Sequence, residues 1–183
     1  MAIGPGELLL GVPEARIVNA AFTHPGPFGG CFHSPQRGAW YAGLEIETLI
    51  AEVAFHKRLF LTDGRIQGQY AFDYIDFLAD FSGLFHTLDA GERESCLLPG
   101  PVPQCYSAPQ SVANRLLFEG SKGIVYPGIR HPFRNLHCVF PSELQLLISP
   151  ELAPQQLQQV YRVTGSSPLL ARYSLRSPWF HFQ

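Results

Sequence analysis

The histidines, cysteines and arginines of this chain are the residues best suited to chemistry, and their spacing excludes several kinds of site. None of the seven histidines belongs to an H-E-x-x-H motif, and the four cysteines contain no C-x-x-C pair, so the sequence predicts no metal site. The chain also lacks a G-x-S-x-G elbow, a Walker loop and a G-x-G-x-x-G fingerprint, which excludes the common hydrolase, NTPase and Rossmann classes. Only Lys57 and Lys122 are lysines among the 13 basic residues, so the other 11 are arginines. This excess indicates binding of phosphate or carboxylate or, as the simpler explanation, a bias in genomic base composition.

Four polar residues remain as candidates for a catalytic or binding site. They are Arg16, Tyr41, Glu52 and Ser107. Each also has an ordinary structural explanation. Arg16 can pair with a neighbouring glutamate, and Tyr41 can belong to the core. Glu52 can be a solvated helix charge, and Ser107 can serve only as a helix cap.

Local sequence patterns predict the elements that carry the first two candidates. Residues 15–20 are short and partly β-branched, which predicts a first strand with Arg16 on one face. Residues 23–38 are rich in Gly, Pro, His and Ser and predict an irregular segment. Residues 39–42 then predict a short strand that contains Tyr41.

The clearest predicted element is an amphipathic helix over residues 44–60. Its apolar residues recur at helical spacing, and Glu52 lies beside the apolar stripe, where a carboxylate can line a cleft next to the core. A second helix is predicted over residues 107–119, with Ser107 as its N-cap and Gly120 ending it.

The remaining patterns complete a mixed order of elements. We expect strands at residues 70–81, 123–127, 136–140 and 160–163, loops at residues 97–104 and 128–135, and a turn of helix at residues 154–158. The loop at residues 128–135 carries Arg130. This order predicts one α+β domain over residues 1–183, with a bent mixed sheet and flanking helices.

The composition indicates a globular protein without a surface for nucleic acids or membranes. Of the 183 residues, 46% are hydrophobic and 15% are charged, and the net charge is −2. This apolar content excludes disorder of the whole chain, and the small net charge argues against binding of DNA, RNA or anionic membranes. No apolar run reaches the ~20 residues of a membrane span, and no signal peptide is evident. We therefore expect a cytoplasmic protein with reduced cysteines.

Several short motifs, in their order along the chain, resemble those of one known family. They are Arg16, GGCFHSP at residues 29–35, WYA at residues 40–42, TLIAEV at residues 48–53, Ser107 before a predicted helix, and GIVYP at residues 123–127. Together they resemble the signature of RES-domain proteins, the NAD-consuming toxins of bacterial toxin–antitoxin pairs. The resemblance covers about residues 16–140.

The resemblance implies a fold similar to ADP-ribosyltransferase toxins and an enzyme that cleaves the nicotinamide–ribose bond of NAD+. NAD+ is then the substrate, inorganic phosphate or water is the acceptor, and no cofactor is implied. Glu52 would stabilise an oxocarbenium-like ribose, and Arg16 would clamp the pyrophosphate or the incoming phosphate. Tyr41 would stack beside the ribose and nicotinamide, and Ser107 would bind phosphate or ribose from a helix N-terminus.

Two positions of this chain depart from the family pattern. The loop arginine of the family is Cys31, and the serine that often follows Tyr-Pro is Gly128. A thiol cannot replace the charge and the five donors of a guanidinium, so Cys31 indicates reduced activity. Arg37 and Arg130 are candidates to bind the same phosphate from other loops.

The resemblance also implies partners. We expect a protein antitoxin, with or without an Xre-like DNA-binding domain, to cover the cleft, and we expect no direct contact with nucleic acid or membrane; the oligomeric state stays open. Three alternatives to the NAD+-degrading toxin also stay open. The chain could transfer ADP-ribose to a protein, it could be a decayed RES fold that binds NAD+ or a partner without turnover, or its motif match could be accidental.

Overall fold

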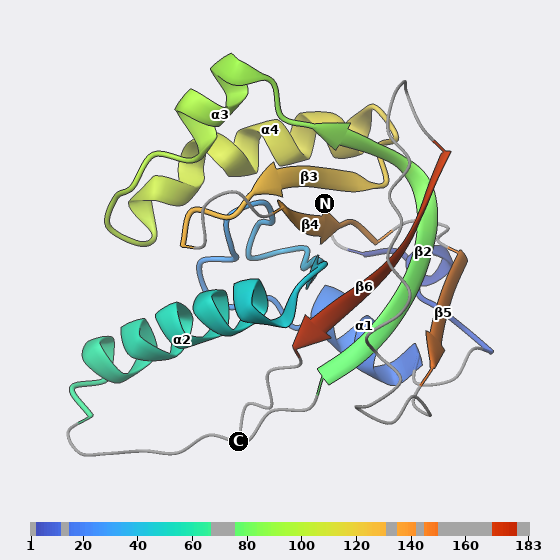
Figure 1. The fold of residues 1–183 in the computed structure, drawn as a ribbon, viewed down its shortest axis with the longest axis horizontal. Helices are drawn as coiled ribbons and strands as arrows, with labels where there is room; N and C mark the ends of the chain where they lie inside the picture. Colours follow the sequence, from blue (N-terminus) through green and yellow to red (C-terminus); the bar gives the residue numbers. More distant parts are fainter. Residues whose placement is uncertain are drawn as a thin grey trace.

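A mixed sheet forms the frame of the molecule, and helices lie around it (Figure 1). The computed structural model describes residues 3–11, 15–66, 76–130, 135–141, 145–149 and 170–178. The helices are α1 (Ala15–Thr23), α2 (Ile46–Asp63), α3 (Ala90–Cys96) and α4 (Ser107–Phe118), with short 3-10 helices η1 (Pro5–Glu7) and η2 (Gln104–Tyr106). The strands are β1 (Trp40–Gly43), β2 (Asp76–Thr87), β3 (Gly123–Pro127), β4 (Asn135–Val139), β5 (Gln145–Ser149) and β6 (Leu170–Pro178). The prediction of an α+β domain is confirmed.

The sheet bends at its longest strand, β2. The strand order is β3-β4-β1-β6-β2-β5. The first part of β2 pairs antiparallel with β5 and β6, whereas Phe85, His86 and Thr87 at its end pair parallel with β3. In Figure 1, β2 accordingly curves from β5 over to β3. The predicted bent mixed sheet is therefore present.

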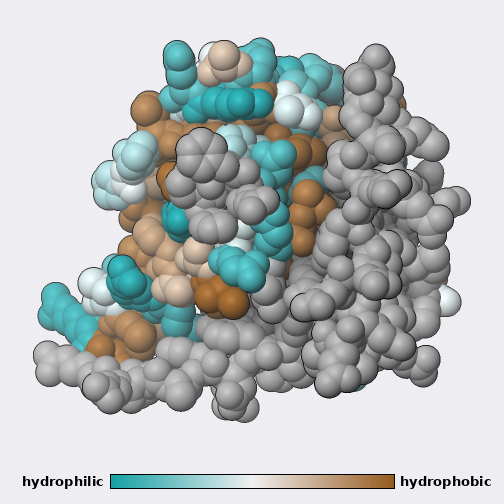
Figure 2. Space-filling view, viewed as in Figure 1, coloured by the Kyte–Doolittle hydropathy of each residue, from teal (hydrophilic) through white to brown (hydrophobic). Residues whose placement is uncertain are grey.

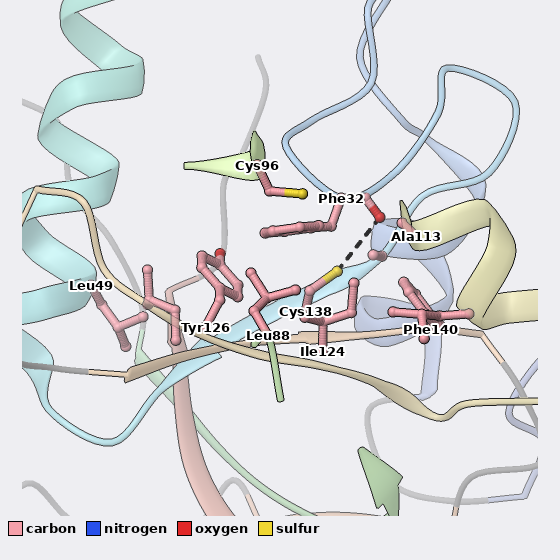
Figure 3. Close-up of a cluster of buried hydrophobic side chains, with 12 residues drawn as sticks. Phe32, Leu49, Leu88, Cys96, Ala113, Ile124, Tyr126, Cys138 and Phe140 are labelled. Carbon is pink, nitrogen blue, oxygen red and sulfur yellow. Dashed lines mark hydrogen bonds between the residues drawn. The ribbon is translucent and has the colours of Figure 1, made fainter. Parts of the chain in front are cut away.

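Strand β1 separates two hydrophobic clusters, because its side chains alternate between the two faces of the sheet. Trp40 and Ala42 pack with Val18 and Phe22 of α1 on one face. Tyr41 packs against the cluster on the other face. Figure 3 shows this second cluster, whose buried members include Phe32, Leu49, Leu88, Cys96, Ala113, Ile124, Tyr126, Cys138 and Phe140. It joins α2 and α4 to the sheet.

The predicted first strand is wrong, because residues 15–20 lie in helix α1. The buried residues of α1, Val18 and Phe22, are four positions apart, so one helical face packs on the sheet. The side chain of Asn19 accepts a hydrogen bond from the Leu9 N–H at 2.9 Å and donates one to the Leu9 carbonyl at 2.8 Å. Tertiary contacts therefore override the strand preference of the β-branched residues in this run.

Most other predicted elements are confirmed, with one correction at the start of α4. The irregular segment, both long helices, the loop before η2 and the strands β1, β3 and β4 lie within a few residues of their predicted bounds. Ser107 is not the N-cap, since its φ of −63° and ψ of −45° are already helical and Tyr106 occupies the cap position. The turn of η2 leads directly into α4, so no side-chain cap is present. Gly120 ends α4 with a φ of 83°, as predicted.

Helix α3 and strands β5 and β6 were not predicted. Helix α3 begins with a capping box, in which Asp89 and Glu92 bond each other's backbone N–H groups, and this D-x-x-E pattern is visible in the sequence. The strand predicted over residues 70–81 coincides with β2 from Asp76 onward. Its first residues, and the elements predicted at residues 154–158 and 160–163, lie outside the described residues.

Candidate active site

An ion pair between Glu52 and Arg130 forms the centre of the candidate site. The Nη1 of Arg130 donates to the Oε2 of Glu52 at 2.8 Å. The two residues are 78 positions apart and come from α2 and from the segment that follows β3. Only 17% of the Glu52 side chain and 24% of the Arg130 side chain are exposed, so both charges are largely removed from water.

The guanidinium of Arg130 also stacks on an aromatic ring. Its Cζ lies 3.7 Å from the centre of the Phe55 ring, which is three residues after Glu52 on α2. Residues three apart lie on the same side of a helix, so α2 presents the carboxylate and the ring together. The helix therefore holds Arg130 by an ion pair and by a cation–π contact.

Burial and the neighbouring arginine act in opposite directions on Glu52. Burial raises the pKa of the Glu52 carboxyl, and the charge and hydrogen bond of Arg130 lower it, with a net rise above the ordinary value. The Oε1 of Glu52 and the Nε of Arg130 are buried and have no hydrogen-bond partner among the described residues. The pair thus keeps one acceptor and one donor for a ligand.

Cys31 belongs to the same cluster, and its thiol is uncharged. Burial raises its pKa to about 12, although the positive charge of Arg130 acts in the opposite direction. The thiol therefore stays protonated at neutral pH and is a poor nucleophile. The charge of Glu52 also acts on this thiol, so the predicted residues Cys31, Glu52 and Arg130 influence one another electrostatically.

The hydroxyl of Tyr41 anchors the loop that carries Cys31. It accepts a hydrogen bond from the Phe32 N–H at 3.0 Å and lies 2.9 Å from the Nδ1 of His33. The carbonyl of Phe32 also accepts a weak bond from the Cys138 thiol at 3.8 Å, drawn as a dashed line in Figure 3. Burial raises the pKa of Tyr41 well above its ordinary value, so the hydroxyl stays neutral. The stacking role predicted for Tyr41 stays a prediction.

Glycine is required where this loop turns back on itself. Gly29 has a φ of 69°, and a Cβ there would lie 2.2 Å from the carbonyl oxygen of His33. A Cβ on Gly30 would lie 2.4 Å from the His33 ring. The two glycines therefore allow the chain before Cys31 to approach His33 closely.

Two histidines near the pair were missed in the prediction of site residues. The Nε2 of His56 lies 4.0 Å from the Oε2 of Glu52, one helical turn away, and the i,i+4 spacing was visible in the sequence. Desolvation and the charge of Arg130 lower the pKa of His56, although water moderates this effect because 42% of its side chain is exposed. Burial lowers the pKa of His33 to about 4. Both rings are therefore uncharged at neutral pH.

The other three predicted residues lie on α1, in the irregular segment before β1 and at the start of α4. Arg16 is exposed on α1, which packs on the opposite face of β1 from Tyr41. Arg37 is buried, forms an ion pair with Glu7 and donates to the Pro141 carbonyl at 2.8 Å. Ser107 is exposed at the start of α4.

The described residues contain neither a cluster of metal ligands nor a helix that could span a membrane. Within residues that the structure describes, no three His, Cys, Asp or Glu side chains are grouped as metal ligands. The helices of the same residues are too short or too polar to span a bilayer. Figure 2 shows hydrophilic and hydrophobic residues interspersed over the described part of one face, around α3 and α4 at the top.

Comparison with known protein families identifies the chain. The family model of the RES domain matches residues 9–158, a range that contains Tyr41, Glu52, Arg130 and the loop with Cys31. The comparisons with curated proteins and with solved structures give no match. Because the matched range covers most of the sequence, the chain belongs to the RES-domain family.

Proposed function

We propose that this protein cleaves the bond between nicotinamide and ribose in NAD+, with water or inorganic phosphate as the acceptor. The observation that carries the proposal is the largely buried carboxylate of Glu52, paired with Arg130. RES domains are associated with NAD-processing enzymes, and this association at the level of the family supports the choice of substrate.

The carboxylate of Glu52 has the properties that this cleavage needs. As the C–N bond breaks, its electron pair passes to the pyridinium nitrogen, and nicotinamide leaves as an uncharged molecule. The ribose carbon then carries the positive charge of an oxocarbenium ion, which a nearby carboxylate stabilises. Attack by water or phosphate forms a new C–O bond, and the proton of an attacking water passes to solvent.

The ion pair suits Glu52 to this role. The unpartnered Oε1 can accept a hydrogen bond from a ribose hydroxyl while Oε2 remains bonded to Arg130. The charge of Arg130 opposes protonation of the partly desolvated carboxylate. The carboxylate can then counter positive charge on the sugar at a site with little water, where electrostatic interactions are strong.

We also propose the biological setting that the family suggests. The protein acts as a cytoplasmic toxin, and a protein antitoxin controls it by covering the site. Cys31 favours one alternative, an attenuated RES protein that binds NAD+ without turnover, because a neutral thiol stands where the family pattern has an arginine. Nicotinamide release from NAD+ with and without phosphate distinguishes the acceptors, and labelled NAD+ reveals any transfer of ADP-ribose to protein.

Glu52→Gln tests the central role of the carboxylate. The variant keeps the size of the side chain and removes its charge, so we expect nicotinamide release to fall by about 10²-fold or more. Glu94→Gln is a matched control, since it removes an exposed carboxylate on α3, and it should keep the activity of the parent protein. NAD+ cleavage by Glu52→Gln at the parent rate would refute the assignment.

A further inference from the structure

The guanidinium of Arg130 has donors that the ion pair does not use. A guanidinium carries five N–H donors. Nη1 bonds Glu52, and the flat face stacks on Phe55. The Nε is buried without a hydrogen-bond partner among the described residues, and a buried donor without a partner is unfavourable. This cost is removed when a ligand supplies an acceptor.

The unused donors lie on the edge of the guanidinium that suits an oxyanion. Nε and Nη2 point the same way and can donate two parallel hydrogen bonds to phosphate oxygens. The contacts with Glu52 and Phe55 fix the position and plane of this edge. Less side-chain freedom is therefore lost when a phosphate binds.

Arg130 also supplies the positive charge of this cluster. The thiol of Cys31 is protonated, and the rings of His33 and His56 are uncharged at neutral pH. Among these described neighbours, Arg130 is thus the group that can attract an anion. Its distance from Glu52 places such an anion close to the sugar on which the carboxylate acts.

We propose that Arg130 binds the phosphate attached to the nicotinamide-bearing ribose and makes the enzyme selective for phosphorylated substrates. This inference rests on the proposed function. A bound phosphate takes up part of the charge of Arg130, so the negative charge of Glu52 acts more strongly on the ribose. The phosphate therefore raises kcat as well as lowering KM.

Two substrates that differ by one phosphate test the proposal. Nicotinamide release is measured from nicotinamide mononucleotide and from nicotinamide riboside, with the parent protein and with Arg130→Gln. We expect the parent to prefer the mononucleotide by about 10²-fold in kcat/KM, the size of one strong or two modest hydrogen bonds between charged groups. In Arg130→Gln this preference should fall below about threefold, with a lower kcat and a higher KM for the mononucleotide.

Two further variants separate a specific role from a general loss of structure. Arg130→Lys keeps the charge but loses the planar fork, so it should restore only part of the preference. Arg115→Gln is the matched control, because it removes a half-exposed guanidinium that is paired with Glu92 and Glu119 on the surface, and it should keep the parent preference. A preference for the mononucleotide that persists in Arg130→Gln would overturn the proposal.

Failure of the proposed function is distinguishable from failure of this inference. If the parent protein releases nicotinamide neither from NAD+ nor from these two compounds, the proposed function fails. Calorimetry with the same two compounds then tests Arg130 by binding alone. Tighter binding of the mononucleotide by the parent, lost in Arg130→Gln, supports the phosphate contact, and equal or absent binding overturns it.

Discussion

Cys31 has a small neutral side chain, and the neighbouring positive charge comes from Arg130, which is distant in the sequence. The charge of Arg130 acts on the Cys31 thiol, and burial keeps this thiol protonated. The Glu52–Arg130 ion pair therefore combines a carboxylate and a guanidinium without a charged residue at position 31. The sequence suggested Arg37 and Arg130 equally, and only the structure separates them, because Arg37 is engaged by Glu7 and Pro141.

The variant Cys31→Arg tests whether position 31 lacks a needed charge. A second guanidinium there would lie beside Arg130 and compete with it for Glu52, so we expect nicotinamide release to rise by less than about threefold. Cys31→Ser, which keeps a small neutral side chain, should match the parent protein. An increase of about tenfold or more in Cys31→Arg would show instead that the natural protein is attenuated.

The long helices α2 and α4 and the short strands β1, β3 and β4 could be predicted from the sequence, whereas the short helix α1 could not. Leu49 and Val53 of α2 are buried as the helical pattern requires, whereas Ile50 of the same predicted stripe is 58% exposed. Helix α1 was mistaken for a strand because its nine residues give too few turns for the helical period to outweigh β-branched residues. The error also misplaced Arg16, which lies on a helix and not on the predicted strand.

An ion pair between the buried Arg37 and the partly exposed Glu7 holds the irregular segment between α1 and β1, and Glu7→Gln tests its contribution to stability. The variant leaves the guanidinium of Arg37 buried without its carboxylate, so we expect the free energy of unfolding to fall by about 2–4 kcal/mol in chemical denaturation. Glu119→Gln, in an exposed pair with Arg115, should change it by less than about 0.5 kcal/mol.

The same ion pair has a defined pH dependence. Arg37 lowers the pKa of Glu7, so the carboxylate stabilises the fold above its unfolded pKa, and this contribution is lost as the pH falls through the lower folded pKa. The pH dependence below about 4.5 should therefore be weaker in Glu7→Gln than in the parent. Equal stability of the variant and the parent at neutral pH would mean that the guanidinium of Arg37 is stabilised by groups other than the Glu7 carboxylate.

For the molecule as a whole, composition and motif order predicted the class of fold but not the meeting of distant residues. Glu52 was placed correctly beside the apolar stripe of α2, because helical geometry is local. Its partner Arg130 could not be identified, since the contact depends on how the segment after β3 passes over α2. Likewise, no local sequence pattern reveals that the hydroxyl of Tyr41 accepts a hydrogen bond from the Phe32 N–H.

A buried histidine makes the stability of the whole molecule sensitive to mild acid. His137 on β4 is 1% exposed, and burial lowers its pKa to about 4. Between about pH 6.5 and pH 4 the unfolded chain binds a proton here that the folded chain does not, so acid favours unfolding by up to about 3 kcal/mol. Chemical denaturation at several pH values measures this change. His137→Gln should make the free energy of unfolding depend less on pH in this range, whereas His24→Gln, at an exposed side chain, should leave the dependence as in the parent. An unchanged pH dependence in His137→Gln would assign the effect to other groups.

The alternation along β1 has a consequence for how this chain can vary in length. The strand has four residues, and its register opposite Cys138 turns Tyr41 away from α1 while Trp40 and Ala42 turn toward it. Inserting or deleting a single residue here would exchange the two sides of the strand. The phenol of Tyr41 would then move away from the loop that contains Phe32, and the indole of Trp40 would enter the space beside α2. We therefore expect descendants of this chain to tolerate substitutions between residues 39 and 43 far better than any change in the number of residues there.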